Sequence, residues 1–578
     1  MSTSDDEIRA AATKYAAHNA SMFEGKAQPG SVIGKMMAEY PELKQRVKEV
    51  MPLIQWAIAE VNSWTPDRQQ RFIEENHPEL LDRKRVEEEK KRLPPLANLD
   101  QWPMVKTRFA PNPDGALHLG SAEPIIFCDE YAKMYGGHFI LRYEDTSAEV
   151  KPPIPEMYSA IVEDLEWLGV RIDERYVQSD RLPIYYEYAE RLLADGKAYV
   201  CTCESEAFKA LYTASKPCPC RELPPSEQLR RWRMMLDGGY AKGDAVVRVK
   251  TDLSHPNPAV RDWPALRISE YPHPLQGTRY RVWPLYNFSC ALDDHLMGVS
   301  HVIRGKEHDV NTTRQRWLHR HLGWRSPEVI NVGRLGLEVG ILSKSKMRRG
   351  IEDGTYLGWD DPRLGTLRAL RRRGLQPEAI RATMLHVGPK PVNVTISWDN
   401  IAAENRRLIE PSSNRYFFVV DPVEVRVTGI PGPHTARLPL HPDHPERGTR
   451  DHAIEPVDGE YSFAVSRDDL DKLRAGGMVR LMGAMNVVVG SESGAPVQAS
   501  YHGREHQAAR EAQAPFIHWL PWGVSPGGTV VMPDAQEARG LVERACLALD
   551  PGTMIQFERL GFCRVDRASP FVAYYAHK

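Results

Sequence analysis

The stretch Thr107–Ser121, T-R-F-A-P-N-P-D-G-A-L-H-L-G-S, guides the interpretation of the whole sequence. Met104 to Phe109 alternates like a strand, the prolines and glycine after it force a turn, and a helix is predicted to begin near His118. Unpaired backbone N–H groups and the helix dipole make such a junction an anion site. His118 can donate to a phosphate oxygen, and Gly120 leaves room for a base or ribose. ATP is therefore the predicted ligand.

In its form R-F-A-P-N-P-x-G-x-L-H-L-G, this stretch resembles the first signature of class I aminoacyl-tRNA synthetases, in the glutamyl and glutaminyl branch. A histidine and glycine alone would fit an ordinary loop equally well. The resemblance implies catalytic roles for His118, Gly120 and Ser121, with the first two at ATP. The sequence departs from the family at Ser121, where the class often has histidine. The resemblance also implies that three residues contact the substrate amino acid: Arg108, Ala110 and Asn112.

Composition sets the broad class of the protein. A chain of 578 residues is too long for one core and predicts three to five domains. Its 42% apolar and 26% charged residues are ordinary for a soluble enzyme, and no apolar run is long enough for a membrane span. The N-terminus has no secretory pattern, and eight cysteines fit a reducing compartment, so we predict a cytoplasmic protein. A net charge of −2 requires any RNA contact to come from local basic faces.

Residues 1–100 are predicted to form a helical extension. Apolar residues recur there every three or four positions, as on one helix face: Leu43, Val47, Val50, Met51, Ile54, Ile58 and Val61. Pro52 is expected to kink or divide that helix. The charged run Lys84–Arg92 fits a solvated helix ending in a linker, with a contact to RNA or a protein partner as the alternative.

Residues 101–200 are predicted to be the first half of a nucleotide-binding domain, with a strand at Phe139–Tyr143 and helices near 156–168 and 182–194. Arg142 and Glu144 fall on one side of the strand, at the end where such sheets bind ligands. A buried Arg–Glu pair can also be scaffolding. The run R-Y-E-D-T resembles the branch's R-x-E-D-T motif, which implies that Glu144 contacts the amino group of the substrate.

Residues 201–280 contain two close cysteine pairs separated by fourteen residues: Cys201, Cys203, Cys218 and Cys220. Four thiolates can surround one Zn²⁺ tetrahedrally, which predicts a structural zinc site, and four reduced thiols beside a turn are the alternative. Similar pairs occur in the connective insertion of archaeal-type glutamyl-tRNA synthetases. That resemblance implies that this segment grips the acceptor end of tRNA.

Residues 281–355 are predicted to return the chain to the nucleotide-binding sheet. The segment from Arg281 to His308 resembles the family's amino-acid pocket, which implies that Tyr286 packs on the substrate and that Arg304 faces its side chain. A guanidinium pairs with a carboxylate but cannot accept from an amide, so Arg304 favours glutamate over glutamine. Cys290 stands where bacterial relatives often have asparagine. A surface or tRNA-contacting arginine is the alternative at position 304.

The segment G-I-L-S-K-S-K at 340–346 resembles the second class I signature. A flexible loop carrying a lysine can close on the triphosphate as pyrophosphate leaves. The resemblance implies that Lys344 is catalytic and that Ser343, Lys344 and Ser345 bind ATP. Ile341 replaces the first lysine of the signature.

Residues 356–412 are predicted to be helical and resemble the family's G-W-D-D-P-R segment. Their basic side chains can bind tRNA phosphates or simply make the face soluble: Arg368, Arg371 and Arg372. Residues 413–578 change to short alternating runs at 423–427, 478–489, 528–532 and 554–565, which predicts one or two β-barrels. The resemblance implies that these barrels read the anticodon.

The resemblance covers the chain from about residue 102 onward and implies the fold class and the reaction. The fold is multidomain α/β, with a Rossmann-like catalytic domain, a connective insertion, a helical stem-contact region and C-terminal all-β barrels. The implied reaction activates L-glutamate with ATP and Mg²⁺ and transfers it to tRNA(Glu), while charging of tRNA(Gln) as well stays open. A glutaminyl enzyme and a non-catalytic tRNA-binding paralogue are the rivals.

Overall fold

The computed structural model describes residues 5–22, 25–40, 43, 46–77, 93–338, 340–474, 477–490 and 496–578. The chain divides into two compact units, 1–92 and 93–578, and each is described by itself. The charged run Lys84–Arg92 lies outside the described residues. In the part of the chain that is described, no helix is both long and apolar enough to cross a membrane.

The first unit is helical, as predicted. Its helices are α1 (Asp5–Met22), α2 (Pro29–Glu39), α3 (Val47–Asn62) and α4 (Pro66–Asn76). Val50, Ile54 and Val61 are buried against α1, in agreement with the predicted apolar face. Pro52 was expected to kink or divide the helix, and it does not divide it, because α3 runs through it. Proline removes one helical hydrogen bond, and the buried residues on both sides of it hold the helix together.

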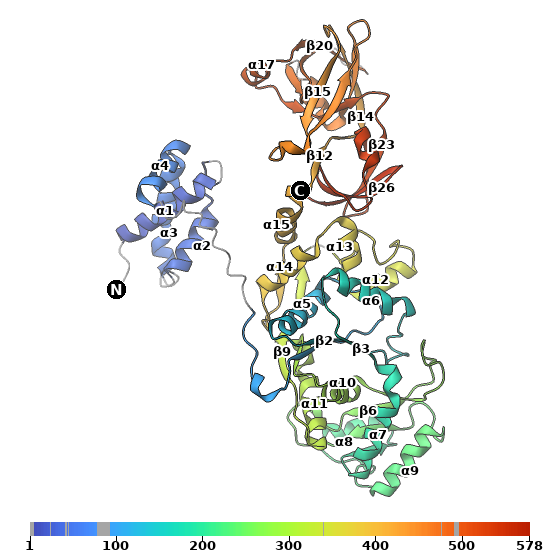
Figure 1. Cartoon of the computed structure of the whole chain (residues 1–578). Helices are drawn as coiled ribbons and strands as arrows, with labels where there is room; N and C mark the ends of the chain where they lie inside the picture. The colour runs from blue at the N-terminus through green and yellow to red at the C-terminus, as the bar shows by residue number, and fades with distance from the viewer. Residues whose placement is uncertain are drawn as a thin grey trace. The chain divides into compact units, whose positions relative to one another are not determined.

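The second unit is built on parallel strands (Figure 1). Strands β1 (Lys106–Phe109), β2 (His138–Tyr143) and β3 (Glu174–Val177) form one parallel sheet, and β8 (His301–Gly305) and β9 (Glu328–Val332) form another. Ser300 N donates to Lys106 O at 2.9 Å, so β8 lies beside β1 and the order is β3-β2-β1-β8-β9. The helices of this region are α5 (Leu119–Met134), α6 (Pro155–Trp167), α7 (Leu182–Ala194), α10 (Tyr286–Leu296) and α11 (Asp309–Leu322).

An antiparallel sheet interrupts the parallel strands. It contains β4 (Ala198–Cys201), β5 (Val246–Val249), β6 (Pro264–Ile268) and β7 (Val282–Pro284), in that order. Helices α8 (Ser205–Thr213) and α9 (Pro225–Leu236) lie between β4 and β5 in the chain. Because β7 ends two residues before Tyr286, this sheet delivers the chain directly to α10.

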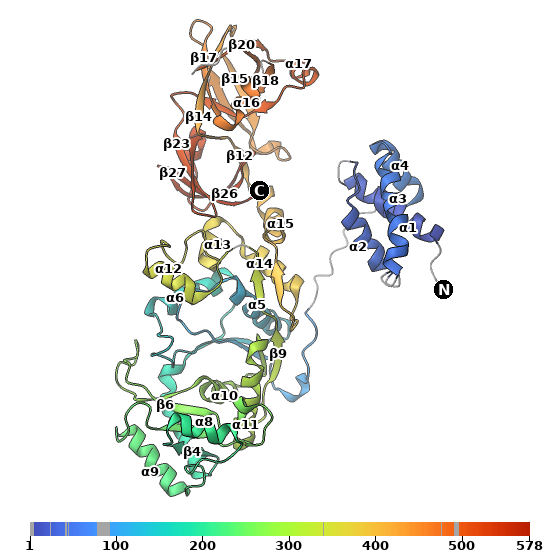
Figure 2. The same ribbon diagram turned by 180° about the vertical axis from the view of Figure 1, so that it is seen from behind.

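A mainly helical region follows the parallel sheet, as predicted. It contains α12 (Lys344–Glu352), α13 (Leu367–Arg373), α14 (Pro377–Val387) and α15 (Trp398–Ile409), while β10 (Leu335–Leu337) pairs with β11 (Val394–Ile396). Figure 2 shows α13, α14 and α15 between the parallel strands and the C-terminal sheets. Arg373 joins the two parts, because its guanidinium donates to Tyr575 O and Ala576 O at 3.3 and 3.1 Å.

The C-terminal part forms two seven-stranded sheets, which confirms the all-β prediction. The first has the order β12-β25-β26-β27-β23-β24-β13 and the second β21-β18-β19-β20-β14-β17-β22. The chain starts the first sheet, builds the second and returns, so the first sheet is made from two separate segments of the chain. The strands are β12 (Asn414–Tyr416), β13 (Phe418–Val420), β14 (Pro422–Thr428), β17 (Tyr461–Ser466), β18 (Met478–Leu481), β19 (Met485–Val489), β20 (Val497–Gly503), β21 (Phe516–Ile517), β22 (Trp519–Pro521), β23 (Gly527–Val531), β24 (Glu537–Val542), β25 (Met554–Phe557), β26 (Gly561–Ala568) and β27 (Phe571–His577).

The C-terminal part also contains one separate strand pair and two short helices. A separate antiparallel pair is formed by β15 (His434–Pro439) and β16 (Thr449–Ile454). Two short helices lie between strands of the second sheet, α16 (Leu470–Arg474) and α17 (His506–Glu511).

Candidate active site

The turn between β1 and α5 is held in place by distant segments of the chain. Glu144 N donates to Pro111 O at 2.9 Å, which ties the turn to the end of β2. Leu119 N donates to Gly365 O and Leu367 N to Leu117 O, at 3.0 and 2.9 Å. A Cβ at Gly115 would come 2.7 Å from the Trp359 ring, so only glycine fits there. The first signature and the G-W-D-D-P-R segment therefore pack directly against each other.

His118 is the N-cap residue of α5, where the predicted helix begins. Burial and the nearby Lys344 lower the pKa of its ring to about 4, so the ring is neutral near pH 7. Its Nδ1 is buried and has no partner among the described residues. Ser121 lies in the first turn, with its N–H donating to His118 O at 2.7 Å. A Cβ at Gly120 would come 3.1 Å from the His118 ring, so this glycine makes room for the ring.

Lys344 brings the second signature to the first. Its Nζ contacts Asp114 Oδ1 at 3.1 Å and Asn112 O at 3.4 Å, across 230 residues of sequence. The structure differs from the predicted flexible loop, because Ser343 is the N-cap of α12 and Lys344 is its first residue. Ser343 Oγ lies 3.2 Å from Ser345 Oγ. The ammonium group of Lys344 and the N-terminus of α12 thus lie beside the turn, where both favour a negatively charged ligand.

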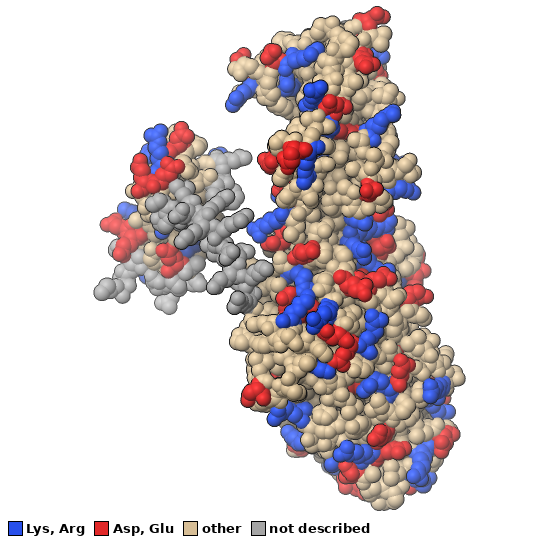
Figure 3. Space-filling model, in the orientation of Figure 1, with Lys and Arg blue, Asp and Glu red and all other residues tan. Residues whose placement is uncertain are grey.

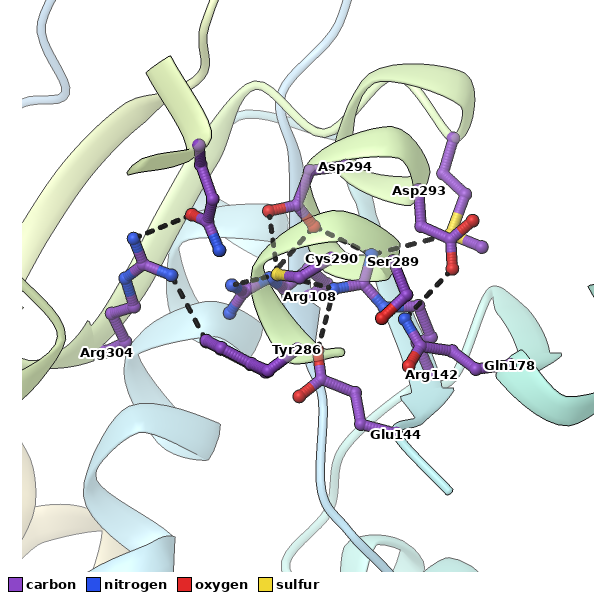
Figure 4. A network of polar contacts seen from close by, with 12 residues as sticks. Arg108, Arg142, Glu144, Gln178, Tyr286, Ser289, Cys290, Asp293, Asp294 and Arg304 are labelled. Carbon is purple, nitrogen blue, oxygen red and sulfur yellow. Dashed lines mark hydrogen bonds and ion pairs between the residues drawn. The ribbon is translucent and has the colours of Figure 1, made fainter. Parts of the chain in front are cut away.

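Arg142 and Glu144 form an ion pair at 3.0 Å, as their spacing predicts, within a buried network (Figure 4). Asp294 Oδ1 accepts from Arg142 Nη1 at 2.7 Å and from Arg108 Nε at 3.3 Å. Cys290 Sγ lies 3.3 Å from Arg142 Nη2. Burial alone would raise the pKa of Asp294, but the two arginines outweigh it and hold the pKa below its usual range. The pKa of Glu144 is raised, because the effect of burial exceeds the opposite effect of Arg142 and Arg108.

Arg304 is buried, with 6% of its surface exposed. Its guanidinium donates to neutral oxygens only: Tyr286 Oη at 3.2 Å, Thr312 Oγ1 at 2.7 Å and Gln315 Oε1 at 3.0 Å. Its Nε has no partner within the described part of the chain. Arg304 is therefore a buried cation that no described carboxylate pairs with, a costly arrangement unless a ligand supplies an anion.

A cavity of about 420 Å³ lies beside this network. Asn112, Glu144 and Tyr286 line it, while Arg304 is connected to it through the Tyr286 hydroxyl. Asn112 also donates to Lys151 O at 3.2 Å, and Ala110 is partly buried at the start of the turn. The remaining wall comes from the loop 146–151, from β6 and β7, and from Gln178 and His308. The volume suits a small charged molecule.

Several residues of this site were not singled out from the sequence. Asp294 organises two arginines, and its neighbour Asp293 accepts from Gln178, Arg181 and Tyr185 at 3.1, 2.9 and 2.6 Å. Two adjacent carboxylates in a helix that is otherwise uncharged apart from one histidine were the available signal, because buried acids require counter-charges. Their partners come from β1, β2, the turn Gln178–Arg181 and α7, so only the fold identifies them.

The four predicted metal-ligating cysteines come together. Their sulfur atoms all lie within 4.8 Å of one another, with 3.9 Å between Cys201 and Cys218 and 3.8 Å between Cys203 and Cys220. A zinc tetrahedron with Zn–S bonds of about 2.3 Å has sulfurs about 3.8 Å apart, so the donor set and its spacing fit this metal.

The arginines predicted to contact tRNA lie on α13 around a cavity of about 530 Å³, but two are paired. Arg368 contacts Glu163 at 2.6 Å, and Arg372 contacts Asp360 at 2.9 Å and Asp566 at 3.4 Å. Arg371 is exposed. Basic and acidic side chains alternate over the face of the second unit seen in Figure 3. The three arginines therefore do not form a free basic patch.

Family models match most of the second unit. A model described as tRNA synthetases class I (E and Q), catalytic domain, matches residues 104–411. Two models described as the anti-codon binding domain of the same synthetases match residues 413–502 and 516–566.

Relatives match the chain along its whole length. It is 52% identical to a glutamate–tRNA ligase of Pyrococcus abyssi, over 99% of this chain and 100% of the relative. It is 51% identical to that of Thermococcus kodakarensis, with the same coverage. A solved glutamate tRNA ligase from Elizabethkingia meningosepticum has 22% identity and a TM-score of 0.39, over 54% of this chain and 70% of that one, which is too low to carry an argument.

Proposed function

The chain belongs to the class I tRNA synthetases for glutamate and glutamine, and we propose that it is the glutamate-specific member, an ATP-dependent glutamate–tRNA ligase. It activates L-glutamate with ATP and transfers the glutamyl group to the 3′ end of tRNA(Glu). The relatives that match its full length are themselves glutamate–tRNA ligases.

One structural observation supports glutamate over glutamine. Arg304 is buried beside Tyr286 without a carboxylate partner among the residues described. In the buried network beside the cavity, Arg108 and Arg142 pair with Glu144 and Asp294, and Arg304 adds a third cation without a described carboxylate partner. The cluster therefore carries one excess positive charge, which the side-chain carboxylate of glutamate neutralises and an amide does not.

The other end of the substrate has matching groups. Glu144 lines the cavity with its carboxylate and suits the α-ammonium group. Tyr286 presents a ring wall and a hydroxyl that stays protonated, because burial raises its pKa. His308 stands beside Tyr286, with ring centroids 5.4 Å apart. In this arrangement Asn112 lines the cavity. Ala110 and Cys290 support the site from positions outside the lining.

The reaction has two steps. The α-carboxylate of glutamate attacks the α-phosphorus of ATP and displaces pyrophosphate, and a ribose hydroxyl of tRNA then attacks the glutamyl carbonyl and displaces AMP. Neutral His118 donates to a phosphate oxygen, and Lys344, Ser343 and Ser345 at the start of α12 stabilise the charge that develops on pyrophosphate. Mg²⁺ bound with ATP would neutralise further phosphate charge.

The four cysteines hold a structural Zn²⁺ in this proposal. With four protein ligands there is no open position, so the metal stabilises the fold between β4 and α9 and performs no chemistry. The two segments they come from are separated by α8, which the metal would fix in place.

The RNA partner spans several parts of the chain. The insertion at 201–280 meets the acceptor end, the helical region at 356–412 meets the stem through Arg371, and the sheets at 413–578 read the anticodon. Arg368 and Arg372 position that region through their carboxylate partners. The protein works in the cytoplasm, and its N-terminal helices are available to a protein partner. Whether tRNA(Gln) is also charged depends on anticodon residues that these observations do not identify.

An ATP–pyrophosphate exchange assay in the presence of tRNA tests this function. Exchange with glutamate and none with glutamine is the expected result. Exchange with glutamine alone would favour a glutaminyl enzyme. Tight tRNA binding without any exchange would favour a non-catalytic tRNA-binding protein.

A further inference from the structure

A second cavity, of about 200 Å³, lies at the far end of β6 from the glutamate site. It shares no lining residue with the larger cavity. Its walls come from α8, from β5 and β6, and from α11, so it joins the antiparallel insertion to the helix that follows β8. The proposed catalytic steps use none of its residues.

The lining of this cavity is strongly basic. It includes Lys209, Arg248, Arg261 and Arg314, and no aspartate or glutamate is among its lining residues. Arg261 donates only to the backbone carbonyls of residues 212, 213 and 255. Arg314 donates to Ala259 O at 2.6 Å, and burial lowers its pKa because no carboxylate opposes that effect.

The carboxylate of Asp262, next to the lining residues Arg261 and Trp263, is engaged elsewhere. Arg248 reaches only the backbone carbonyl of Asp262, at 3.3 Å. The Asp262 carboxylate accepts instead from Tyr199 Oη at 2.9 Å and Arg221 Nε at 2.8 Å. Lys209 lies 3.8 Å from Glu206 in an exposed ion pair, so three arginines of the lining have no carboxylate partner among the described residues: Arg248, Arg261 and Arg314.

Two buried N–H donors in the same lining have no partner. Trp263 is 1% exposed, and its Nε1 makes no hydrogen bond within the described residues. Arg248 Nε is likewise buried and unpartnered there, while its guanidinium stacks 3.5 Å from the centre of the Phe208 ring. A buried donor of this kind destabilises the fold unless a ligand or water accepts from it.

We propose that this cavity is a phosphate-binding site, in which Arg314, Arg248 and Trp263 donate to the oxygens of one phosphate group. An oxyanion suits the basic lining and its two unpartnered donors, because it is small, carries negative charge and accepts several hydrogen bonds at once. An uncharged acceptor would leave the charges of three arginines unbalanced in a confined space.

The phosphate can come from two sources. One is a backbone phosphate of the bound RNA, since basic side chains of RNA-binding proteins mostly contact phosphates, and this arm rests on the proposed function. The other is free inorganic phosphate, which does not depend on that function. The two arms of the test separate these sources.

In the RNA arm, tRNA affinity is measured over a range of salt concentrations for the full chain and its Arg314→Met variant. Loss of one phosphate contact is expected to weaken binding and to reduce the slope of log K against log salt by about 0.7–0.9. Arg316→Met is the matched control, because Arg316 is exposed on the same helix and does not line the cavity. It should leave the slope unchanged.

In the phosphate arm, broadening of the ³¹P resonance of inorganic phosphate is measured with the same three proteins. Any phosphate held in the ATP site contributes equally to all three, so the difference between wild type and Arg314→Met reports this cavity. Trp263→Phe keeps the ring and every charge but removes one donor. Trp263→Phe should reduce the salt slope if the ligand is an RNA phosphate, or the ³¹P broadening if it is free phosphate. Unchanged melting temperatures would show that the variants are folded.

A reduced salt slope in Arg314→Met alone would assign the cavity to an RNA phosphate. Loss of ³¹P broadening alone would assign it to free phosphate. If wild type binds tRNA but Arg314→Met and Arg316→Met behave alike in both arms, the phosphate site is wrong while the proposed function stands. If wild type binds no tRNA, the proposed function is wrong, and the phosphate arm decides this inference alone.

Discussion

Gly120 lies against the ring of His118, and this contact gives the glycine a different role from the one its sequence motif implies. We expected its missing side chain to admit the nucleotide. In the structure a Cβ at this position would come 3.1 Å from Cε1 and Nδ1 of His118. The glycine therefore fixes the position of the ring that we propose donates to the phosphates.

Gly120→Ala should consequently displace the imidazole by a few tenths of an ångström. We expect kcat for exchange to fall by about 10- to 100-fold, because positioning errors at reacting groups are costly. Gly34→Ala is the control, since nothing lies within 4 Å of the added methyl in α2. It should keep full activity and gain up to about 1 kcal/mol of stability. Wild-type turnover in Gly120→Ala would contradict this role.

At the same scale, sequence reasoning identified motifs that the fold brings together but missed the residues that support them. Lys344 contacts Asp114 in the turn before His118, and Glu144 N donates to Pro111 O of the same turn, while the roles of these residues stay predictions. The role of Asp294 was missed because its partners, Arg108 and Arg142, lie on two strands far away in the chain. A pattern within one segment cannot show which distant charge a buried carboxylate meets.

At the scale of elements, predictions failed where tertiary packing outweighs local preference. α3 continues through Pro52, and the second signature opens α12 instead of forming a loop. By contrast, strands and helices with clear periodicity fell where the sequence places them, and α7 matches its predicted bounds. The paired arginines of α13 could not be foreseen, because their partners Glu163 and Asp566 lie in other elements.

The cysteine site gives a prediction at this scale. The purified chain should contain one Zn²⁺, and Cys203→Ser should lower both the zinc content and the melting temperature, because the metal closes the loop around α8. Cys563→Ala, at a buried cysteine in the C-terminal sheets, is the control for metal content measured by mass spectrometry. Equal zinc in the wild type and Cys203→Ser would exclude this site.

At the scale of the whole second unit, Arg373 couples the helical region to the C-terminal sheets. It stacks 4.4 Å from the Trp398 ring centre and donates to two carbonyls of β27. Burial lowers its pKa to about 10, so it remains charged near pH 7. This side chain therefore links α13 and α15 to β27 of the proposed anticodon-binding sheets.

Arg373→Met keeps the apolar stem and removes both hydrogen bonds. The KM for tRNA should rise several-fold and the melting temperature should fall, whereas the Kd values for ATP and glutamate should stay the same. Arg407→Met on α15 is the control, because Arg407 is 67% exposed and pairs only with Glu404. A rise in the Kd for glutamate equal to the rise in KM for tRNA would show a general loss of structure and contradict a coupling role.

The central claim is that a buried arginine without a protein carboxylate selects an acidic amino acid. It is tested most directly by the kcat/KM for glutamate in tRNA-dependent pyrophosphate exchange with Arg304→Gln, beside the exposed control Arg316→Gln. We predict a loss of about 10³-fold or more in the first variant, with ATP and tRNA affinities retained, and none in the second. An Arg304→Gln enzyme that activates glutamate as well as wild type would contradict the account.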